Sequence, residues 1–177
     1  MLIETTPLEG VLLTSLQKIE DERGFFARTY CQQEFASAGV DIHLLQTNVS
    51  GNKHKGTLRG LHYQAEPHPD KKLVTCTRGA VFDVVVDLRK ESSTYCQWFG
   101  VELSADNRKG LYVPPGCAHG FVTLEDNTEV HYLMGETYHA DLARGARWND
   151  PAFGIEWPIQ PVTINERDAA YPHWEKT

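Results

Sequence analysis

Several polar side chains fall on or beside strongly apolar segments of the chain, namely His62, Lys72, Asp83, His119 and Tyr132. A buried polar group is costly unless it is hydrogen-bonded or faces a ligand cavity. Each residue alone is also consistent with a satisfied core position or a solvated strand end. Together they indicate a cavity, in which a histidine that titrates near neutral pH would act as a base or a hydrogen-bond donor.

Alternation along two segments predicts where two of these side chains point. In 129–134, Val130, Tyr132 and Met134 share one face of a strand, so Tyr132 should point inward beside apolar neighbours. In 57–64, positions 58, 60, 62 and 64 share a face, so His62 can point into the same interior. The two residues are therefore expected to meet inside one barrel or sandwich.

The segment 114–119 reads PPGCAH and matches the P-x-G-x-x-H pattern of the second cupin motif, in which the histidine is often a metal ligand. Metal-binding cupins add an H-x-H and a glutamate, but this chain reads His62-Tyr63-Gln64 at that place. The pattern favours a jelly-roll barrel. It favours a role for His119 as a base or a hydrogen-bond donor over a role as a metal ligand.

Periodicity predicts an all-β fold, because short β-type runs are broken by turn residues and only one brief piece, 32–38, is helix-like. The run from Ala80 to Val86 is almost continuously apolar and should be a strand buried on both faces. The expected strands are 11–19, 25–31, 44–49, 57–64, 72–77, 80–88, 97–103, 110–113, 120–124 and 129–134.

Length and composition restrict the class of protein. A chain of 177 residues suits a single domain spanning 1–177. The formal charge of -7, without a basic block, argues against nucleic acid as a partner. The lack of a long apolar run or a signal-peptide pattern argues against a membrane and predicts a cytoplasmic protein. The four cysteines form no C-x-x-C pair and are interpreted as buried thiols.

At 58–64, LRGLHYQ, the chain resembles the dTDP-4-dehydrorhamnose 3,5-epimerase family of the cupin superfamily. The likeness continues over nearly the whole chain, in the family's order and spacing. It runs through 21–26 (DERGFF), 46–48 (QTN), 72–74 (KLV), 83–87 (DVVVD), 115–121 (PGCAHGF) and 148–151 (WNDP).

This resemblance implies a cupin-type jelly-roll homodimer in which an N-terminal segment completes the partner's active site, without a metal or an organic cofactor. It implies that His62 is the general base, Asp168 orients it, Tyr132 is the proton donor and Lys72 holds the C4 oxygen of the sugar. The positions implied to bind the nucleotide sugar, with Tyr138 stacking on the base, are Arg23, Phe26, Gln46, Asn48, Arg59, His119, Tyr138 and Arg167.

The implied reaction fits these residue types. Inversion of a carbon beside a ketone requires a base on one face of the ring and an acid on the other. The enolate that forms gathers charge on the C4 oxygen, which a lysine can neutralise. The expected substrate is dTDP-4-dehydro-6-deoxy-D-glucose, on the route to dTDP-rhamnose and polysaccharide.

Three positions depart from the family pattern. Arg28 and Ala143 replace acidic residues at substrate-binding positions, and Asn165 replaces a common serine. The first two changes keep other activities open: epimerisation at C3 or C5 alone, or a sugar on another nucleotide. Two further classes are a non-catalytic sugar-binding cupin and a metal-dependent cupin oxygenase or isomerase.

Overall fold

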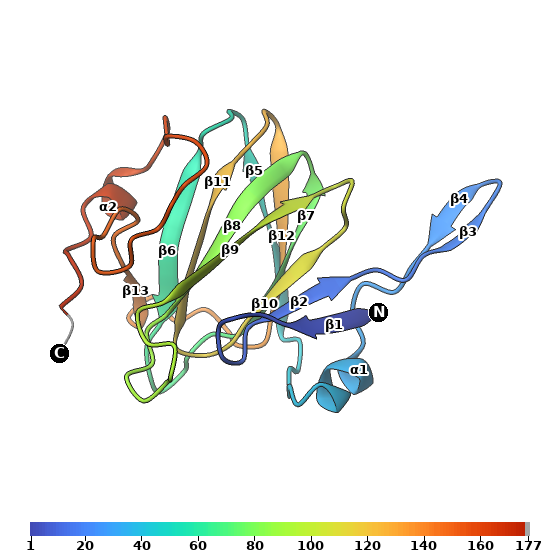
Figure 1. Cartoon of the computed structure of the whole chain (residues 1–177), viewed down its shortest axis with the longest axis horizontal. Helices are drawn as coiled ribbons and strands as arrows, with labels where there is room; N and C mark the ends of the chain where they lie inside the picture. Colours follow the sequence, from blue (N-terminus) through green and yellow to red (C-terminus); the bar gives the residue numbers. More distant parts are fainter. Residues whose placement is uncertain (176–177) are drawn as a thin grey trace.

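Two antiparallel sheets face each other in the computed structural model, which describes residues 1–175 (Figure 1). The all-β class is confirmed, because helix within these residues is confined to two short pieces, α1 (Gln32–Ser37) and α2 (Glu166–Ala169). No helix among these residues is long and apolar enough to cross a membrane.

The first sheet has the strand order β1-β2-β10-β7-β12-β5. Its strands are β1 (Leu2–Thr5), β2 (Leu12–Ser15), β10 (Gly110–Val113), β7 (Lys72–Arg78), β12 (Thr128–Met134) and β5 (Gln46–Asn52). Neighbours in this order are antiparallel, and Tyr132 of β12 pairs with Asn48 of β5 on one side and Val74 of β7 on the other.

The second sheet has the strand order β13-β6-β11-β8-β9. Its strands are β13 (Ala143–Gly145), β6 (Leu58–Gln64), β11 (Cys117–Thr123), β8 (Ala80–Asp87) and β9 (Trp98–Ser104). His62 of β6 and His119 of β11 are direct partners in this sheet.

The valine-rich strand β8 is buried on both faces, as its continuous apolar pattern predicts. Val81 and Val85 belong to the core between the sheets, whereas Val84 and Val86 pack under residues near the C-terminus, including Phe153. Period-two alternation along β8 thus divides one apolar run between two cores.

The inner face of the first sheet passes from core to cavity along two strands. On β12, Val130 is in the core while Tyr132 and Met134 line a cavity. On β7, Val74 is in the core while Lys72 lines the same cavity.

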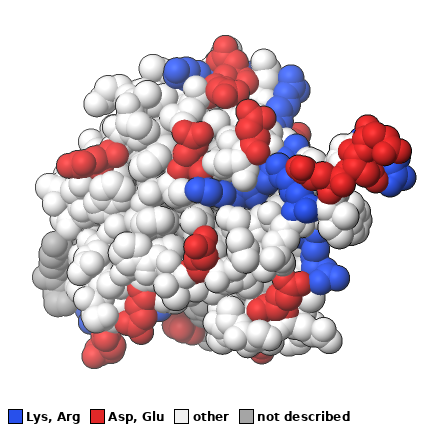
Figure 2. All heavy atoms as spheres, turned by 45° about the vertical axis from the view of Figure 1, so that its right-hand side comes forward, with Lys and Arg blue, Asp and Glu red and all other residues white. Residues whose placement is uncertain are grey.

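A third, two-stranded element projects from the rest of the fold (Figure 1). It is the hairpin of β3 (Ile19–Asp21) and β4 (Gly24–Phe26), which carries acidic side chains at its tip in Figure 2. The predicted strands 11–19 and 25–31 are wrong in extent, because β2 ends at Ser15 and β4 at Phe26. Every residue of the hairpin is exposed, so it has no buried face that would produce a clear alternation.

Other boundaries shift less. The strand expected at 120–124 begins at Cys117, which places His119 inside β11 instead of in the preceding turn. The sequence did not indicate β1, β13 or α2, each of four residues or fewer. Three of the four free cysteines are buried as expected, and Cys31 is half-buried.

Candidate active site

A cavity of about 610 Å³ lies between the two sheets and opens to the surface. The first sheet contributes polar side chains from β5, β7 and β12, and the second contributes them from β6, β11 and β13. The residues singled out from the sequence that line it are Gln46, Asn48, Arg59, His62, Lys72, His119, Tyr132, Tyr138 and Arg167.

His62 lies on the wall formed by the second sheet and is joined to a buried carboxylate. Its Nε2 lies 2.7 Å from Oδ1 of Asp168, whose other oxygen accepts a hydrogen bond of 2.9 Å from the Gly60 amide. Asp168 is 1% exposed. Burial alone would raise the pKa of Asp168, but the hydrogen bonds from His62 and Gly60 outweigh it and the pKa is lowered. The carboxylate therefore remains charged and keeps a proton on Nε2, which leaves Nδ1 of His62 as the basic nitrogen.

Asp168 reaches this position because α2 begins just before it. The side chain of Asn165 caps the helix by accepting a hydrogen bond of 2.7 Å from the Asp168 amide. Asparagine caps helices about as well as serine does, so the departure at this position preserves the local structure.

Arg59 joins His62 in the cavity because β6 is not a regular strand. The pairing of β6 with β11 shifts register between His119 and Phe121, so Arg59 faces Phe121 while His62 faces His119. A register shift of this kind re-aims side chains. Of positions 58, 60, 62 and 64, which were expected to share one face, His62 and Gln64 line the cavity and the other two do not.

Tyr132 lies on the opposite wall, formed by the first sheet. Its hydroxyl lies 3.3 Å from the hydroxyl of Ser50, and its ring meets that of His119 edge-on with centroids 6.3 Å apart. Burial raises the pKa of Tyr132 to about 12, so the phenol keeps its proton throughout the physiological range.

Lys72 lies on the same sheet as Tyr132, where it pairs with Met134 of β12. Its Nζ lies 2.6 Å from Oδ2 of Asp70, and both groups are buried. Burial alone would raise the pKa of Asp70, but the positive charge of Lys72 outweighs it and the pKa is lowered. The cavity thus holds a lysine whose position is fixed by a carboxylate.

His119 forms a second buried histidine–carboxylate pair. Its Nε2 lies 2.8 Å from Oδ1 of Asp83, which is fully buried. Within residues 1–175, no set of three ligating side chains surrounds His119. The pairing with the Asp83 carboxylate supports a hydrogen-bonding role for His119.

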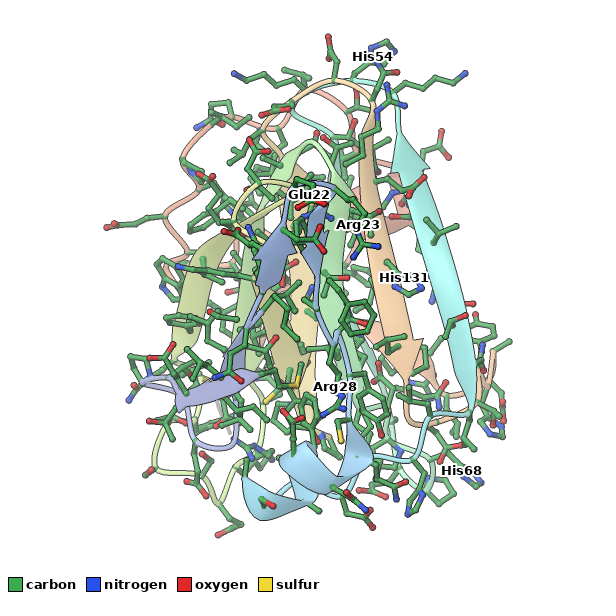
Figure 3. All side chains as sticks on the ribbon, turned by 90° about the vertical axis from the view of Figure 1, so that its right-hand side faces the viewer. Glu22, Arg23, Arg28, His54, His68 and His131 are labelled. Carbon is green, nitrogen blue, oxygen red and sulfur yellow. The ribbon has the colours of Figure 1, made fainter. Side chains whose placement is uncertain are left out.

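The remaining expected nucleotide contacts divide between two parts of the molecule. Tyr138 is 66% exposed at the cavity rim, and its amide donates a hydrogen bond of 3.0 Å to Oε1 of Gln46. Arg23 and Phe26 do not line this cavity, because they lie on the projecting hairpin (Figure 3). Phe26 is 73% exposed, and the ion-pair partner of Arg23 within residues 1–175 is nearby Asp21.

Arg28 and Ala143, which depart from acidic residues in the family pattern, lie in different parts of the structure. Ala143 lines the cavity, so the position at which the family resemblance implies an acid carries a methyl group on the cavity wall. Arg28 instead lies near α1 (Figure 3), where its guanidinium lies 2.6 Å from Glu34. The other oxygen of the Glu34 carboxylate pairs with the amino group of Met1 at 2.6 Å.

The sequence reasoning did not single out Ser50, Asp70 or Arg144, all of which line the cavity. Asp70 lies in a stretch that reads as a polar turn, HPDKK, and only its pairing with Lys72 reveals a role. The alternation of β5 places Ser50 on the same face as Gln46 and Asn48, which was a usable signal.

Comparison with known proteins identifies the family of the chain. The family model described as dTDP-4-dehydrorhamnose 3,5-epimerase matches residues 5–176. The enzyme of that name from Salmonella typhimurium is 44% identical over 174 residues, covering 97% of this chain and 94% of the relative.

Solved structures agree over the same extent. The Bacillus anthracis dTDP-4-dehydrorhamnose 3,5-epimerase with TDP and PPi bound has a TM-score of 0.93 at 40% identity, covering 97% of this chain and 98% of that one. The Legionella pneumophila dTDP-6-deoxy-D-glucose-3,5-epimerase in complex with dTDP-4-keto-L-rhamnose has a TM-score of 0.89 at 34% identity, with coverages of 96% and 90%. The fold is a cupin-type jelly roll, and the chain belongs to the dTDP-4-dehydrorhamnose 3,5-epimerase family.

Proposed function

We propose that this chain epimerises C3 and C5 of dTDP-4-dehydro-6-deoxy-D-glucose to give dTDP-4-dehydro-L-rhamnose. One observation carries the proposal: His62, which is paired with Asp168, and the Tyr132 phenol come from opposite sheets and line the same cavity. An epimerase needs such a pair of groups on opposite faces of a sugar ring. The Legionella relative binds dTDP-4-keto-L-rhamnose, which is the class of product expected here.

In the proposed reaction, Nδ1 of His62 removes the proton beside the C4 ketone. Asp168 holds the proton on Nε2 at 2.7 Å and stabilises the imidazolium that forms. The electron pair left by the proton moves to the C4 oxygen, which becomes an enolate.

Lys72 is proposed to meet that enolate oxygen. A preorganised donor of this kind typically contributes about 3 to 4 kcal/mol to the transition state. Asp70 keeps the ammonium group in place before the substrate arrives, so little reorganisation is needed when the charge develops.

Tyr132 then returns a proton to the opposite face of the carbon. The phenol has a pKa raised to about 12, mainly by burial, so it is present as the acid. The hydrogen bond with Ser50 and the charge of Arg59 act in the opposite direction and favour the phenolate that remains after transfer. The proton taken up by His62 and the one lost by Tyr132 are exchanged with water to restore the enzyme.

The nucleotide diphosphate is proposed to lie toward the rim of the cavity, with Tyr138 stacked on the base. Arg59 and Arg167 supply positive charge there, and guanidinium groups bind phosphate oxygens through paired hydrogen bonds. The proposed polar contacts to the nucleotide sugar also include Gln46, Asn48 and His119.

The projecting hairpin supports a homodimer as part of the proposal. Phe25 and Phe26 are large apolar side chains that are exposed on β4. Arg23, at the turn of the hairpin, does not line the cavity of its own chain. We infer that the hairpin enters the partner's cavity, where Arg23 and Phe26 contact the nucleotide sugar.

Mixing two inactive variants tests this arrangement. In a dimer of one Arg23→Ala chain and one His62→Ala chain, an exchanged hairpin leaves one site with both residues intact. An equal mixture should then recover about a quarter of wild-type sites after random reassortment of a two-fold dimer. No recovery, with mixed dimers demonstrated by mass, would assign Arg23 to the site of its own chain, and full activity of Arg23→Ala alone would assign it to no site.

Hydrogen exchange in deuterated water tests the epimerase activity itself. The wild-type chain should exchange the C3 and C5 hydrogens of the substrate and invert both carbons, as read by NMR. Tyr132→Phe should retain exchange at the base's face and fail to invert, and His62→Ala should abolish exchange. Equal loss of exchange and inversion in Tyr132→Phe would contradict its role as the acid.

The same assay separates the alternatives. Exchange at only C3 or only C5 would identify a mono-epimerase, which the carboxylate missing at Ala143 keeps as a second candidate. Exchange at neither carbon, with the sugar nucleotide still bound, would identify a binding protein. Activity abolished by chelators and restored by metal would identify a metal-dependent enzyme.

We infer that residues 1–177 form one domain and that the protein lies in the cytosol. All four cysteines are free, which is typical of a reducing compartment. Burial raises the pKa of Cys76 to about 11 and that of Cys117 to about 12, so both remain unreactive thiols.

A further inference from the structure

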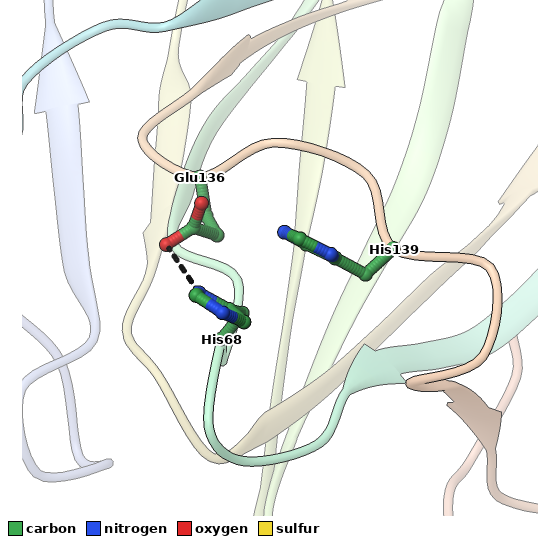
Figure 4. Close-up of side chains that lie close together, drawn as sticks. All are labelled: His68, Glu136 and His139. Atoms are coloured by element: carbon green, nitrogen blue, oxygen red, sulfur yellow. Dashed lines mark ion pairs between the residues drawn. The ribbon is translucent and has the colours of Figure 1, made fainter.

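Three side chains that the proposed reaction does not use gather beside the cavity: His68, Glu136 and His139 (Figure 4). Each offers a ligand atom, and these atoms all lie within 4.8 Å of one another. His68 comes from the loop between β6 and β7, and the other two from the loop after β12. Glu136 also lines the cavity, so the cluster lies at its edge.

The arrangement within the cluster leaves one carboxylate oxygen available. Oε1 of Glu136 accepts hydrogen bonds from the amide and hydroxyl of Thr137 at 2.7 and 3.1 Å. Oε2 lies 3.8 Å from Nδ1 of His68. The imidazole rings of His68 and His139 stack with centroids 4.4 Å apart and planes at 9°.

The backbone beneath the cluster is held by one buried amide. Nε2 of Gln64 donates to the carbonyl oxygen of His68 at 2.5 Å, and its Oε1 accepts from the amide of His139 at 2.8 Å. Gln64 is 6% exposed and lies on β6. The two loops that supply the histidines are thus positioned relative to each other without a metal, which lowers the conformational cost of binding one.

We propose that His68, Glu136 and His139 bind one divalent transition-metal ion of the zinc class. Two imidazole nitrogens and one carboxylate oxygen suit Zn²⁺, Ni²⁺ or Cu²⁺, whereas Mg²⁺ and Ca²⁺ prefer oxygen ligands alone. With three protein ligands, the ion keeps at least one position for water.

Binding requires a small rearrangement of the rings. Metal ligands lie in the plane of an imidazole, so the stacked rings must tilt apart to direct two nitrogens at one point. The hydroxyl of Thr137 lies 3.1 Å from Nε2 of His139. If Nε2 binds the metal, this contact must break, and if Nδ1 binds it, the hydroxyl can remain as the partner of the other ring nitrogen. The ion would then join the two loops and fix the segment that carries Tyr138.

Metal titration of the whole chain tests the proposal. Untagged protein stripped with a chelator is titrated with ZnCl₂ alone by calorimetry, in a buffer that does not bind zinc. We expect one ion per chain. Losing even an outer-shell partner typically costs roughly 10- to 100-fold in metal affinity. His139→Ala and His68→Ala, which lose a direct ligand, should each therefore weaken binding at least ten-fold.

Two further variants make the result specific. Glu136→Gln keeps an Oε1 acceptor for Thr137 but removes the charge, and it should also weaken zinc binding. His54→Ala removes an exposed histidine at the opposite end of the molecule from His68 (Figure 3) and should bind zinc as the wild type does.

A second measurement guards against misfolded variants. Zinc should raise the melting temperature of the wild type and of His54→Ala, and raise that of His139→Ala less at the same zinc concentration, while MgCl₂ changes none of them. Absence of saturable zinc binding to the wild type, or equal affinity in His139→Ala, would overturn the proposal. Because no sugar nucleotide is present, the outcome is independent of whether the chain is an epimerase.

Discussion

Replacing Asp168 by asparagine should inactivate the chain through the wrong histidine tautomer. Asp168 accepts two hydrogen bonds, from Gly60 N–H at 2.9 Å and from His62 Nε2 at 2.7 Å. An asparagine that satisfies Gly60 must direct its oxygen there and its NH₂ group toward His62. The imidazole then accepts at Nε2 and carries its proton on Nδ1, so the nitrogen facing the substrate cannot act as a base.

The size of the effect follows from the two bonds. Turning the amide around restores the basic Nδ1 but leaves the buried Gly60 N–H without an acceptor, at a cost of about 1 to 3 kcal/mol. The imidazolium also loses a hydrogen bond to a charged group, worth about 1.5 to 3 kcal/mol. A total of about 2.5 to 6 kcal/mol corresponds to a fall in turnover of roughly 10²- to 10⁴-fold.

The assay is the rate of C3 and C5 hydrogen exchange in deuterated water under saturating substrate. Binding of dTDP should be unchanged, because Asp168 does not line the cavity. Asp150→Asn is the matched control, since Asp150 is also buried, accepts hydrogen bonds from backbone amides and lies outside the cavity. Exchange by Asp168→Asn within ten-fold of the wild type would refute this account of the base.

Three other outcomes are expected. Lys72→Met should lower turnover roughly 10²- to 10³-fold by removing one preorganised donor. It should also destabilise the fold, because it leaves Asp70 buried without its cation. Adding Asp70→Asn to this variant should restore the free energy of urea unfolding but not turnover. The pH–rate profile should show no loss from Tyr132 ionisation up to pH 10, because burial raises its pKa to about 12; a falling limb below pH 10 that is absent in Tyr132→Phe would contradict this. Burial alone would raise the pKa of Asp87, but hydrogen bonds from its neighbours lower it from 3.8 to about 2. The Asp87 carboxylate should therefore contribute about 2 kcal/mol to the free energy of unfolding above pH 4, and this contribution should be lost as the pH falls toward 2. Urea unfolding of Asp87→Asn should lack this pH dependence, whereas unfolding of the control Asp106→Asn, at an exposed position, should retain it.

Local pattern was sufficient for the fold class and for part of the site. The apolar run of β8 predicted a strand buried on both faces, and the alternation of β12 directs Tyr132 inward. These features depend on side-chain period, which is a property of consecutive residues. The likeness of LRGLHYQ and the other segments to a known family supplied the candidate roles of His62 and Asp168.

The tertiary structure decided which distant groups meet, because contacts between strands and loops far apart in the chain leave no local pattern. It brings Asp168 from a four-residue helix near the C-terminus to His62, 106 positions earlier in the chain. The register shift between β6 and β11 places Arg59 in the cavity against simple alternation. It also separates Arg23 from the cavity, because the hairpin that carries Arg23 is exposed throughout and projects from the rest of the fold.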